Sequence, residues 1–396
     1  MVFGVFRKGV YLMAINIAVI GGGIGGLTAG IALRQKGFSV TLFEQATEIS
    51  EVGAGLQISA NAVRVLNALG LKPQDWQCSK PKSVMLHDYK RGDLVTSVAM
   101  NVTPDAPYLQ FHRADLIEKL MDAAINAGVT IKLGKQVTVS GTGPNTVLID
   151  GQNFDLVVGA DGVRSTVRDQ FYDGEKPQFT GKIAWRGLVN AADLLGQPIQ
   201  NTRIYMGPNK HIVMYPLRDG KLINIVAVEE RATWTAEGWN HAGNADELRH
   251  LFNGWCAPVI TALAQVKSTI VWGLFAHPTL HNWVKNRLVL LGDSAHPMVP
   301  FVAQGACMAI EDAWVLANQL ARKNDITKAL QAYQAIRKPR ATKVQQTALK
   351  SGNIYHTANP LARGVLHTGM RLTSKLSPAI MAGHYDWIYN HDVTVD

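Results

Sequence analysis

The sequence has few of the residues that build disulfide frameworks or metal sites. Only three cysteines occur among 396 residues, Cys78, Cys256 and Cys307, and none belongs to a CxxC pair. This argues against a disulfide scaffold and a cysteine metal site, and it favours a reducing compartment, so we expect a cytoplasmic location. His277 and His281 have the spacing of a metal pair on a helix, but the proline between them disfavours a helix, so no metal is expected.

Long apolar runs and clusters of one charge are also missing. The sequence contains no stretch of about 18 uninterrupted apolar residues, so it predicts no transmembrane segment. Lysines and arginines give a net charge of +9 but are dispersed, which argues against nucleic-acid binding and would attract small anions. An apolar run at residues 10–20 follows two basic residues, as in a signal peptide, yet a cleaved segment would not continue directly into a glycine-rich turn. We expect residues 1–12 to be a leader outside the fold.

The N-terminal region predicts a dinucleotide-binding βαβ unit. An apolar, β-branched run at 15–20 is typical of a buried parallel strand, residues 27–34 favour a helix capped by Gly37, and residues 40–43 favour a second strand. The glycine fingerprint between the first strand and the helix comprises Gly21, Gly23, Gly25 and Gly26. Such glycines let backbone N–H groups approach a pyrophosphate at a helix N-terminus. Glu44, at the end of the second strand, is expected to accept hydrogen bonds from a ribose.

A second signature lies far downstream, where residues 290–297 read Leu-Leu-Gly-Asp-Ser-Ala-His-Pro. Two signatures so far apart indicate one extended dinucleotide held at both ends. This points to FAD as a resident redox cofactor, and so to an enzyme. A long helix is expected to start at Gly305, and the positive end of its dipole would face the flavin pyrimidine ring, which becomes anionic when reduced.

The order of the expected elements predicts an α/β fold. A Rossmann-like FAD-binding domain would carry an inserted antiparallel-sheet substrate domain and be followed by C-terminal helices. A buried strand is expected at 154–160, closely spaced strands with a hairpin at Arg218–Gly220 follow residue 181, and a helix is expected over 326–346. The expected boundaries are FAD-binding segments at 13–83, 106–180 and 275–346, sheet-domain segments at 84–105 and 181–274, and a helical tail at 347–396. The tail is expected to pack over the substrate domain or to form a homodimer contact, with binding to a membrane surface as the alternative.

Further motifs strengthen this interpretation. They are Glu51–Gln57, His112–Leu116, Gly159–Gly162 and Gly292–Asp312. With the glycine fingerprint, they resemble the class A flavin-dependent aromatic hydroxylases, the p-hydroxybenzoate hydroxylase family, over about residues 15–340. The resemblance is to the salicylate hydroxylase, 3-hydroxybenzoate 6-hydroxylase and 6-hydroxynicotinate 3-monooxygenase branch. Gln57 and Phe301 stand where the hydroxynicotinate enzyme has histidine-type residues, so a carbocyclic phenol or hydroxybenzoate fits this resemblance better.

The resemblance implies roles for individual residues around FAD. Arg113 would contact the FAD, Asp161 would serve the motif linked to both FAD and NAD(P)H, and Asp293 would bond the ribityl chain. A surface salt bridge for Arg113 and a simple Asp-Gly turn at Asp161 are the alternatives. The same resemblance extends the cofactor site to Gln45, Gly55, Gly305 and Ala306.

The expected strand His211–Tyr215 carries the substrate-site prediction. Because side chains alternate along a strand, His211, Val213 and Tyr215 share one face. In the resembling branch His211 and Tyr215 fall on active-site positions, and the histidine is implied to act on the substrate hydroxyl proton. The alternative is an ordinary strand-edge histidine beside a core tyrosine. Further residues expected at the substrate are Gln304, also as a catalytic residue, together with Tyr108 and Pro300.

The resemblance implies an FAD-dependent monooxygenase that hydroxylates a phenolic acid similar to salicylate or hydroxybenzoate. NADH or NADPH would reduce the flavin, and a flavin C4a-hydroperoxide formed with O2 would transfer oxygen to the ring. No second nucleotide fingerprint is visible in the sequence, so NAD(P)H is expected to bind transiently in a surface cleft. Two alternatives remain open. One is a hydroxylase of a polycyclic or quinone-precursor substrate, and the other is an FAD-binding protein without turnover.

Overall fold

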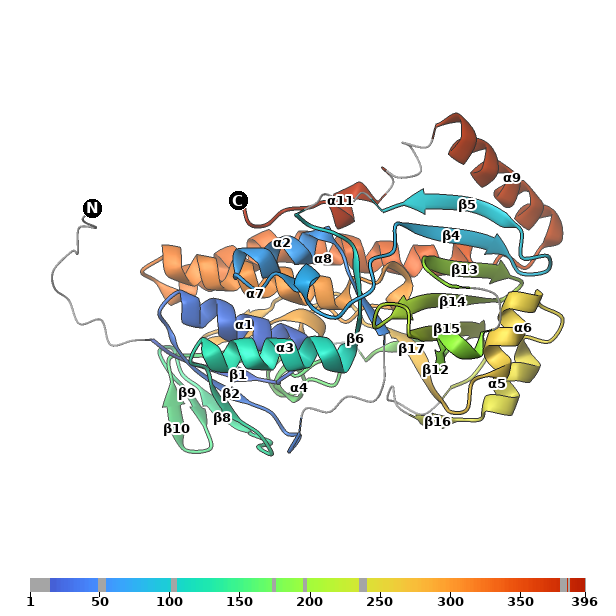
Figure 1. The fold of residues 1–396 in the computed structure, drawn as a ribbon. Coiled ribbons are helices and arrows are strands. Elements are labelled where there is room, and N and C mark those ends of the chain that lie inside the picture. The colour runs from blue at the N-terminus through green and yellow to red at the C-terminus, as the bar shows by residue number, and fades with distance from the viewer. Residues whose placement is uncertain are drawn as a thin grey trace, which may run out of the picture.

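The computed structural model describes residues 15–48, 55–100, 105–172, 176–194, 198–234, 241–377, 383 and 385–395. The leader expected at 1–12 and the first four residues of the Glu51–Gln57 motif lie outside these ranges. The described chain forms two parts that lie side by side (Figure 1). One part is built on a mostly parallel sheet and the other on an eight-stranded sheet. The predicted fold class, a Rossmann-like domain with an inserted sheet domain and C-terminal helices, is confirmed.

A six-stranded sheet with the order β18-β19-β11-β1-β2-β7 forms the centre of the first part. β1 lies in the middle and pairs in parallel with β2 and β11, as the predicted βαβ unit requires. Ile17, Ala18 and Val19 are fully buried, so this strand is covered on both faces, which explains its continuous apolar run. The strands are β1 (Asn16–Ile20), β2 (Ser39–Phe43), β7 (Thr130–Lys132), β11 (Leu156–Gly159), β18 (Val284–Lys285) and β19 (Leu288–Leu290).

Helices pack on this sheet and bring distant segments together. α1 begins within the glycine fingerprint and contacts both α3 and α7. α7 in turn packs against α2 and α8, so the C-terminal signature lies beside the N-terminal one. The helices are α1 (Ile24–Gln35), α2 (Ala60–Ala68), α3 (Arg113–Asn126), α4 (Thr166–Phe171), α7 (Gly305–Arg322) and α8 (Ile326–Ile354). Short 3-10 turns are η1 (Pro73–Asp75), η2 (Ala191–Asp193), η3 (Gly292–Ser294) and η4 (Pro300–Val302).

The strand predicted at 154–160 is divided at Asp155, and this is a correction. Phe154 ends β10, which belongs to a small antiparallel sheet, whereas Leu156 begins β11 of the central sheet. The Asp155 carboxylate accepts a 2.7 Å hydrogen bond from the Asn16 amide, which fixes the chain where it passes between the sheets. The remaining short strands are β8 (Val139–Thr142), β9 (Val147–Ile149) and β10 (Gln152–Phe154), with β3 (Gly55–Ile58) and β6 (Leu109–His112) forming a separate pair.

The second part is the eight-stranded sheet, in the order β16-β17-β12-β15-β14-β13-β4-β5. It includes the two early strands expected to join it, and the hairpin at Arg218–Gly220 is confirmed by three consecutive residues with positive φ. The prediction of a purely antiparallel sheet was wrong at one point, because β13 pairs in parallel with β4. Its strands are β4 (Ser83–Asp88), β5 (Leu94–Ala99), β12 (Gln178–Asn190), β13 (Thr202–Gly207), β14 (Lys210–Leu217), β15 (Leu222–Glu230), β16 (His241–Gly243) and β17 (Thr269–Ala276).

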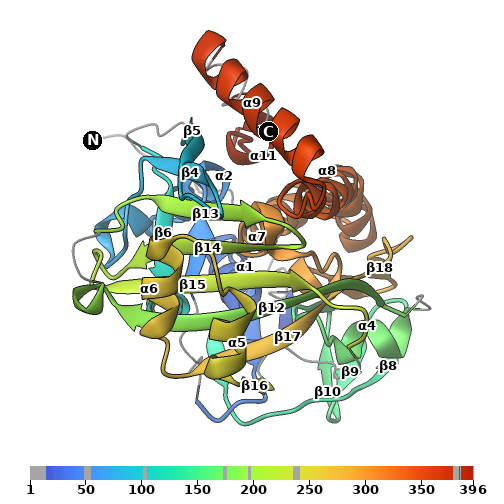
Figure 2. The same ribbon diagram turned by 90° about the vertical axis from the view of Figure 1, so that its right-hand side faces the viewer.

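The two faces of this sheet have different neighbours. Helices α5 (Ala245–Leu251) and α6 (Ala257–Ala264) cover the outer face (Figure 2). Ile212 and Met214 are fully buried in the apolar cluster under these helices. The opposite face, which we call the inner face, is turned towards the cofactor part. The alternation predicted for β14 therefore places its odd-numbered residues on the inner face.

The C-terminal region departs from the predicted boundaries. α8 continues to Ile354 with Pro339 inside it, so the boundary expected at 346/347 falls within this helix. α9 (Pro360–Leu376) then packs against β5 with His367 turned inward, while Leu361 and Val365 remain exposed. A short helix, α11 (Asp386–Tyr389), returns to the cofactor part (Figure 1). Among the residues that the structure describes, no helix has the length and apolar character needed to cross a membrane.

Candidate active site

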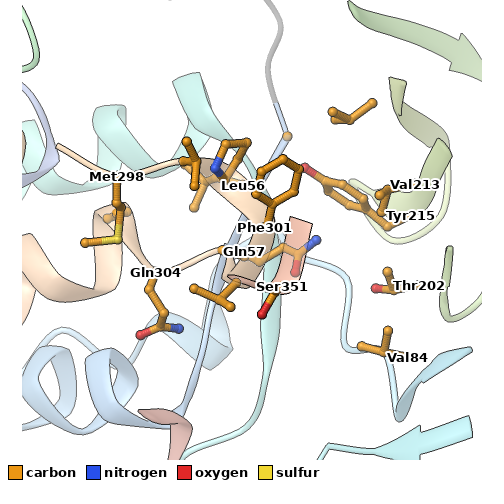
Figure 3. A pocket seen from close by; sticks show the side chains of 18 of the residues that line it. Leu56, Gln57, Val84, Thr202, Val213, Tyr215, Met298, Phe301, Gln304 and Ser351 are labelled. Carbon is orange, nitrogen blue, oxygen red and sulfur yellow. The ribbon is translucent and has the colours of Figure 1, made fainter. Parts of the chain in front are cut away.

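One cavity of about 600 Å³ connects the two parts of the molecule. Its walls come from the glycine turn before α1, from the segment that leads through η3 and η4 into α7, and from the inner face of the sheet. Figure 3 shows Val213 and Tyr215 reaching in from the sheet, while Met298 and Gln304 lie on the opposite side. The cavity therefore joins residues predicted to hold a cofactor with residues predicted to hold a substrate.

The fingerprint glycines shape the cofactor end of this cavity. Gly21 has a φ of +108°, which favours glycine, and a Cβ on Gly26 would lie 1.9 Å from the Gly21 carbonyl oxygen. A Cβ on Gly25 would lie 2.8 Å from the Leu291 side chain. Gly23 also lines the cavity, and it differs from these three because no described atom lies within 4 Å of its Cβ position. The space in front of Gly23 is therefore open to a ligand.

Two helix N-termini meet the same cavity. Within the described residues, no side chain caps the first turn of α1 or of α7. Gly23 and Gly25 line the cavity at the start of α1, and Gly305 and Ala306 line it at the start of α7. Uncapped N–H groups and the helix dipole favour an anionic group at each place. This arrangement fits FAD, whose pyrophosphate would be held at α1 and whose flavin would lie at α7.

Glu44 holds the glycine turn in place. Its Oε2 accepts a 2.6 Å hydrogen bond from the Gly22 amide, and its Oε1 accepts one of 2.8 Å from the Ala46 amide. Each carboxylate oxygen keeps a second acceptor site, so a ribose contact remains compatible with these bonds. Gln45 is exposed beside it and does not line the cavity. The cofactor contacts of both residues stay predictions.

Of the charged residues predicted near FAD, Asp293 and Arg113 line the cavity and Asp161 does not. The Asp293 side chain is accessible from the cavity, but protein atoms surround it on the other sides. This desolvation raises the pKa of its carboxyl group, although the nearby His296 and Arg113 act in the opposite direction. Arg113 also lines the cavity, at the first turn of α3. Asp161 lies just outside, between the cavity residues Ala160 and Gly162. Its Oδ1 accepts a 3.0 Å hydrogen bond from the Ser294 hydroxyl group, which ties the end of β11 to η3.

A buried ionic network fixes the segment that leads into α7. The carboxylate of Asp312 accepts hydrogen bonds from the Gly292 amide at 3.0 Å, from His296 Nε2 at 2.6 Å and from Arg337 Nε at 2.7 Å. Arg337 also donates to Glu311 at 2.6 Å, and all three charged side chains are fully buried. Burial alone would raise the pKa of Asp312, but His296 and Arg337 lower it to about 2. The network therefore ties Gly292 and His296 of the second signature to Asp312 of α7.

The inner face of the sheet forms the end of the cavity where the sequence predicts the substrate. His211, Val213 and Tyr215 all line the cavity, so the predicted face of β14 is confirmed. A Cβ on Gly55 would lie 2.7 Å from the Tyr215 hydroxyl oxygen and 2.8 Å from Asn224. Gly55 therefore allows β3 to approach Tyr215 closely. Burial raises the pKa of Tyr215 to about 12, against the effect of the nearby Arg186, so its hydroxyl group stays protonated at neutral pH.

His211 has a partner that the sequence did not indicate. Its Nδ1 lies 2.7 Å from Nε2 of His356, a residue 145 positions away, just after α8. Only 2% of His211 is exposed, and burial, with smaller effects of His356 and Lys182, lowers its pKa well below the ordinary value. His356 is buried too, and its Nδ1 lies 3.1 Å from Oε1 of Glu230. Both rings are therefore neutral at pH 7.

Gln304, Tyr108 and Pro300, all predicted at the substrate, line the cavity but differ in what their side chains bind. Gln304 was expected to act in catalysis, but its Nε2 donates to Ser59 Oγ at 2.8 Å and its Oε1 accepts from Asn61 at 3.0 Å. These bonds give the Gln304 amide a structural part in the wall, because it is 1% exposed and turned to its protein partners. Tyr108 lines the cavity with its hydroxyl group donating to Gln57 Oε1. Pro300 lines the cavity at the start of η4, as expected.

Several residues that line the cavity were not predicted from the sequence. Arg186 and Trp272 face the cavity from neighbouring strands, with the guanidinium carbon 5.1 Å from the centre of the Trp272 ring. Tyr355 and Met370 reach the cavity from the C-terminal region. Period-2 alternation in β12 could have indicated Arg186, since its neighbours Trp185 and Gly187 face the other way. No local pattern indicates the residues that follow α8.

Comparison with known proteins shows the family of this chain. Residues 14–348 match a family model described as FAD binding domain. The chain is 30% identical to salicylate hydroxylase from Pseudomonas putida, over 97% of this chain and 94% of the relative. It is 32% identical to 3-hydroxybenzoate 6-hydroxylase from Polaromonas naphthalenivorans (strain CJ2), over 95% and 96%. The chain belongs to this FAD-binding family of aromatic hydroxylases.

Solved structures show the same relationship. A salicylate hydroxylase substrate complex matches 96% of this chain and 97% of that chain, at 27% identity and a TM-score of 0.79. Klebsiella pneumoniae HpxO complexed with FAD and uric acid matches 93% and 96%, at 25% identity and a TM-score of 0.81. The chain is therefore an FAD-dependent monooxygenase that acts on a small aromatic molecule. FAD is the cofactor of this family, and the open glycine turn and uncapped helices described above fit it.

Proposed function

We propose that this enzyme hydroxylates a phenolic ring bound between the inner face of the sheet and FAD, with NADH or NADPH as electron donor and O2 as oxygen source. The observation that carries the proposal is the continuous cavity, which places neutral His211 and protonated Tyr215 in the same space as the start of α7. FAD, when bound, supplies electron transfer and oxygen activation. The residues of the chain bind the ring, orient it and manage its proton.

His211 is the proposed general base for the phenol. Its Nδ1 is engaged with His356, so Nε2 is the nitrogen available to a ligand in the cavity. Removal of the phenolic proton raises the electron density of the ring, which favours attack by an electrophilic oxygen. The protonated hydroxyl group of Tyr215 would donate a hydrogen bond to the resulting phenolate or to a neighbouring carboxylate. Apolar side chains such as Ile204 and Val228 exclude water around both groups.

The proposed substrate is a phenolic acid similar to salicylate or hydroxybenzoate. A buried carboxylate needs a cationic or hydrogen-bonding partner, and Arg186 supplies a cation on the inner face among the described cavity residues. The end of the cavity near β4 and β5 is apolar instead, with Leu86, Val98 and Met370. This end favours a second candidate, a polycyclic or alkyl-substituted phenol without a carboxylate.

A panel of phenols tests the proposal. Salicylate, 3-hydroxybenzoate, 4-hydroxybenzoate and 2-naphthol would be compared for stimulation of NADH and NADPH oxidation, with the products identified by mass spectrometry. A product that has gained one oxygen on the ring supports hydroxylation. The proposal is contradicted if the enzyme binds FAD but no phenol of the panel stimulates NADH or NADPH oxidation or yields such a product. Arg186→Gln should raise KM for the benzoates by about tenfold and leave 2-naphthol nearly unchanged, if a carboxylate pairs there. Equal effects on both classes would contradict that pairing.

A further inference from the structure

The buried histidine pair has a structural continuation to the protein surface. We propose that His356 and Glu230 complete a proton path that starts at His211 and carries the substrate hydroxyl proton from the cavity to solvent. The path rests on the proposed role of His211 as the base, and it adds two residues to that role. His356 and Glu230 do not touch the reacting ring in this proposal, so they act as relay and positioning residues.

The three groups form an unbroken line. His211 Nδ1 lies 2.7 Å from His356 Nε2, and His356 Nδ1 lies 3.1 Å from Glu230 Oε1. The side chains change from buried to open along this line, since His356 is 1% exposed and Glu230 is 41% exposed. His211 pairs with Val228 across the sheet, so Glu230 lies on the same face of β15, two residues further. The line therefore runs along the inner face and leaves it at the end of β15.

The carboxylate sets the direction of every hydrogen bond in the line. An ionised Glu230 can only accept, so His356 Nδ1 must carry the proton and donate it. A neutral His356 then has its lone pair on Nε2, where it accepts from the Nδ1–H of His211. His211 in turn has its lone pair on Nε2, the nitrogen available to the cavity. A single exposed acid thereby holds a buried histidine in the tautomer that a base requires.

Proton transfer along this line balances without a redox step. The phenolic O–H bond breaks as an N–H bond forms at His211 Nε2, and the Nδ1 proton of His211 passes to His356 Nε2. The Nδ1 proton of His356 passes to Glu230, which releases it to water. Both rings end neutral in the opposite tautomer. The same transfers in reverse return a proton to the phenolic oxygen of the product and restore the starting tautomers.

The surroundings explain why such a relay is useful. Burial disfavours an imidazolium at either histidine, so a proton that stayed on His211 would leave a costly buried charge. The titratable and charged groups that face the pair are Tyr355, whose hydroxyl group stays protonated because burial raises its pKa, and Lys182 from β12, 3.9 Å from Glu230. The Phe301 ring covers His211 from η4. Among these described neighbours, only Glu230 is an anion that can receive the proton.

The tautomers can be measured without any substrate. In FAD-loaded enzyme with ¹⁵N-labelled histidine, NMR should show both His211 and His356 as neutral Nδ1–H tautomers at pH 7. Glu230→Gln should shift both rings towards a mixture of tautomers, because an amide can donate as well as accept. His367→Gln, at another buried histidine 3.7 Å from an acid, is the matched control and should leave both signals unchanged. Nε2–H tautomers in the wild type, or no response to Glu230→Gln, would overturn the path.

A second measurement follows the proton itself. With 4-nitrophenol as probe at pH 6, stopped-flow absorbance should show phenolate forming on binding to the FAD-loaded enzyme. Glu230→Gln and His356→Gln should slow this step by about tenfold or more, and His211→Ala should abolish it. Equal rates in the wild type and Glu230→Gln would overturn the relay while leaving His211 as the base. A wild type that ionises no probe would contradict the proposed base itself, and the NMR result would still decide the order of the hydrogen bonds.

Discussion

The backbone amide of Gly292 donates a 3.0 Å hydrogen bond to the Asp312 carboxylate, which joins η3 to the second turn of α7. Both ends of this bond are buried, and Arg337 from α8 neutralises the acid. The bond therefore fixes where α7 begins relative to the loop that carries Asp293. A cofactor held by the start of α7 depends on this arrangement, although Asp312 itself does not line the cavity.

Removal of the arginine in this network should be costly. Arg337→Leu leaves the carboxylates of Glu311 and Asp312 buried without their shared partner, and a broken buried pair typically costs about 3–5 kcal/mol. Urea unfolding of the FAD-loaded enzyme measures the loss as a lower midpoint. The control Arg91→Leu, at an exposed position, should change the free energy of unfolding by less than about 0.5 kcal/mol. A midpoint like that of the control would show that Arg340 alone neutralises Glu311.

Because the space at Gly23 is open, a side chain placed there should reduce the affinity for FAD. Gly23→Val should fold, because no described atom lies near its Cβ position, but the side chain would occupy the space in front of α1. FAD binding should fall by at least about a hundredfold, since backbone N–H groups could no longer approach the pyrophosphate. Gly141→Val, also without a described atom within 4 Å, is the matched control and should retain FAD. Flavin absorbance of the purified variants distinguishes the two outcomes.

Gly55 should matter for substrate binding through its close approach to Tyr215. A Cβ there collides with Tyr215 and Asn224, so Gly55→Ala should displace the tyrosine hydroxyl group while FAD still binds. We expect KM for a productive phenol to rise by about tenfold, which corresponds to roughly one hydrogen bond. Gly364→Ala in α9, where the Cβ position is open, should leave KM unchanged. If both variants kept wild-type KM, Tyr215 would not contact the substrate.

Much of this fold could be predicted because its signals are local. The βαβ unit follows from glycines and apolar runs that are adjacent in the sequence, and the inner face of β14 follows from simple alternation. His356 could not be predicted in this way. Its contact with His211 depends on the length of α8 and on the path of the chain after it, and the helix predicted over 326–346 continues to Ile354. The catalytic role of Gln304 stays a prediction: its motif was evident in the sequence, but the bonds of its amide to Ser59 and Asn61 could not be predicted from that motif.

The buried histidines predict how stability changes with pH. In the unfolded chain a histidine has a pKa of about 6.5, whereas burial lowers the pKa of His356 to about 4. Between these values the unfolded state binds more protons, so stability falls as the pH decreases from about 6.5 to 4. Free energies of unfolding, obtained from urea titrations at pH 7 and pH 5, should differ by up to about 2 kcal/mol for this residue. His356→Gln should reduce that difference, and the exposed control His281→Gln should not. If both variants showed the same difference between pH 7 and pH 5, other residues would cause the pH dependence.

Substitution of His211 should separate catalysis from cofactor function. As a test of the proposed base, His211→Ala should retain FAD and the reduction of FAD by NAD(P)H, because the residue lies on the sheet side of the cavity. Hydroxylation should fall by about 10²- to 10⁴-fold, since the phenolic proton is no longer removed. The electrons taken from NAD(P)H should then appear as hydrogen peroxide. Tyr215→Phe should mainly raise KM, because it removes one hydrogen bond of about 1 kcal/mol and leaves the base intact. If His211→Ala formed product at the wild-type rate and with unchanged coupling, the histidine would have only a structural role.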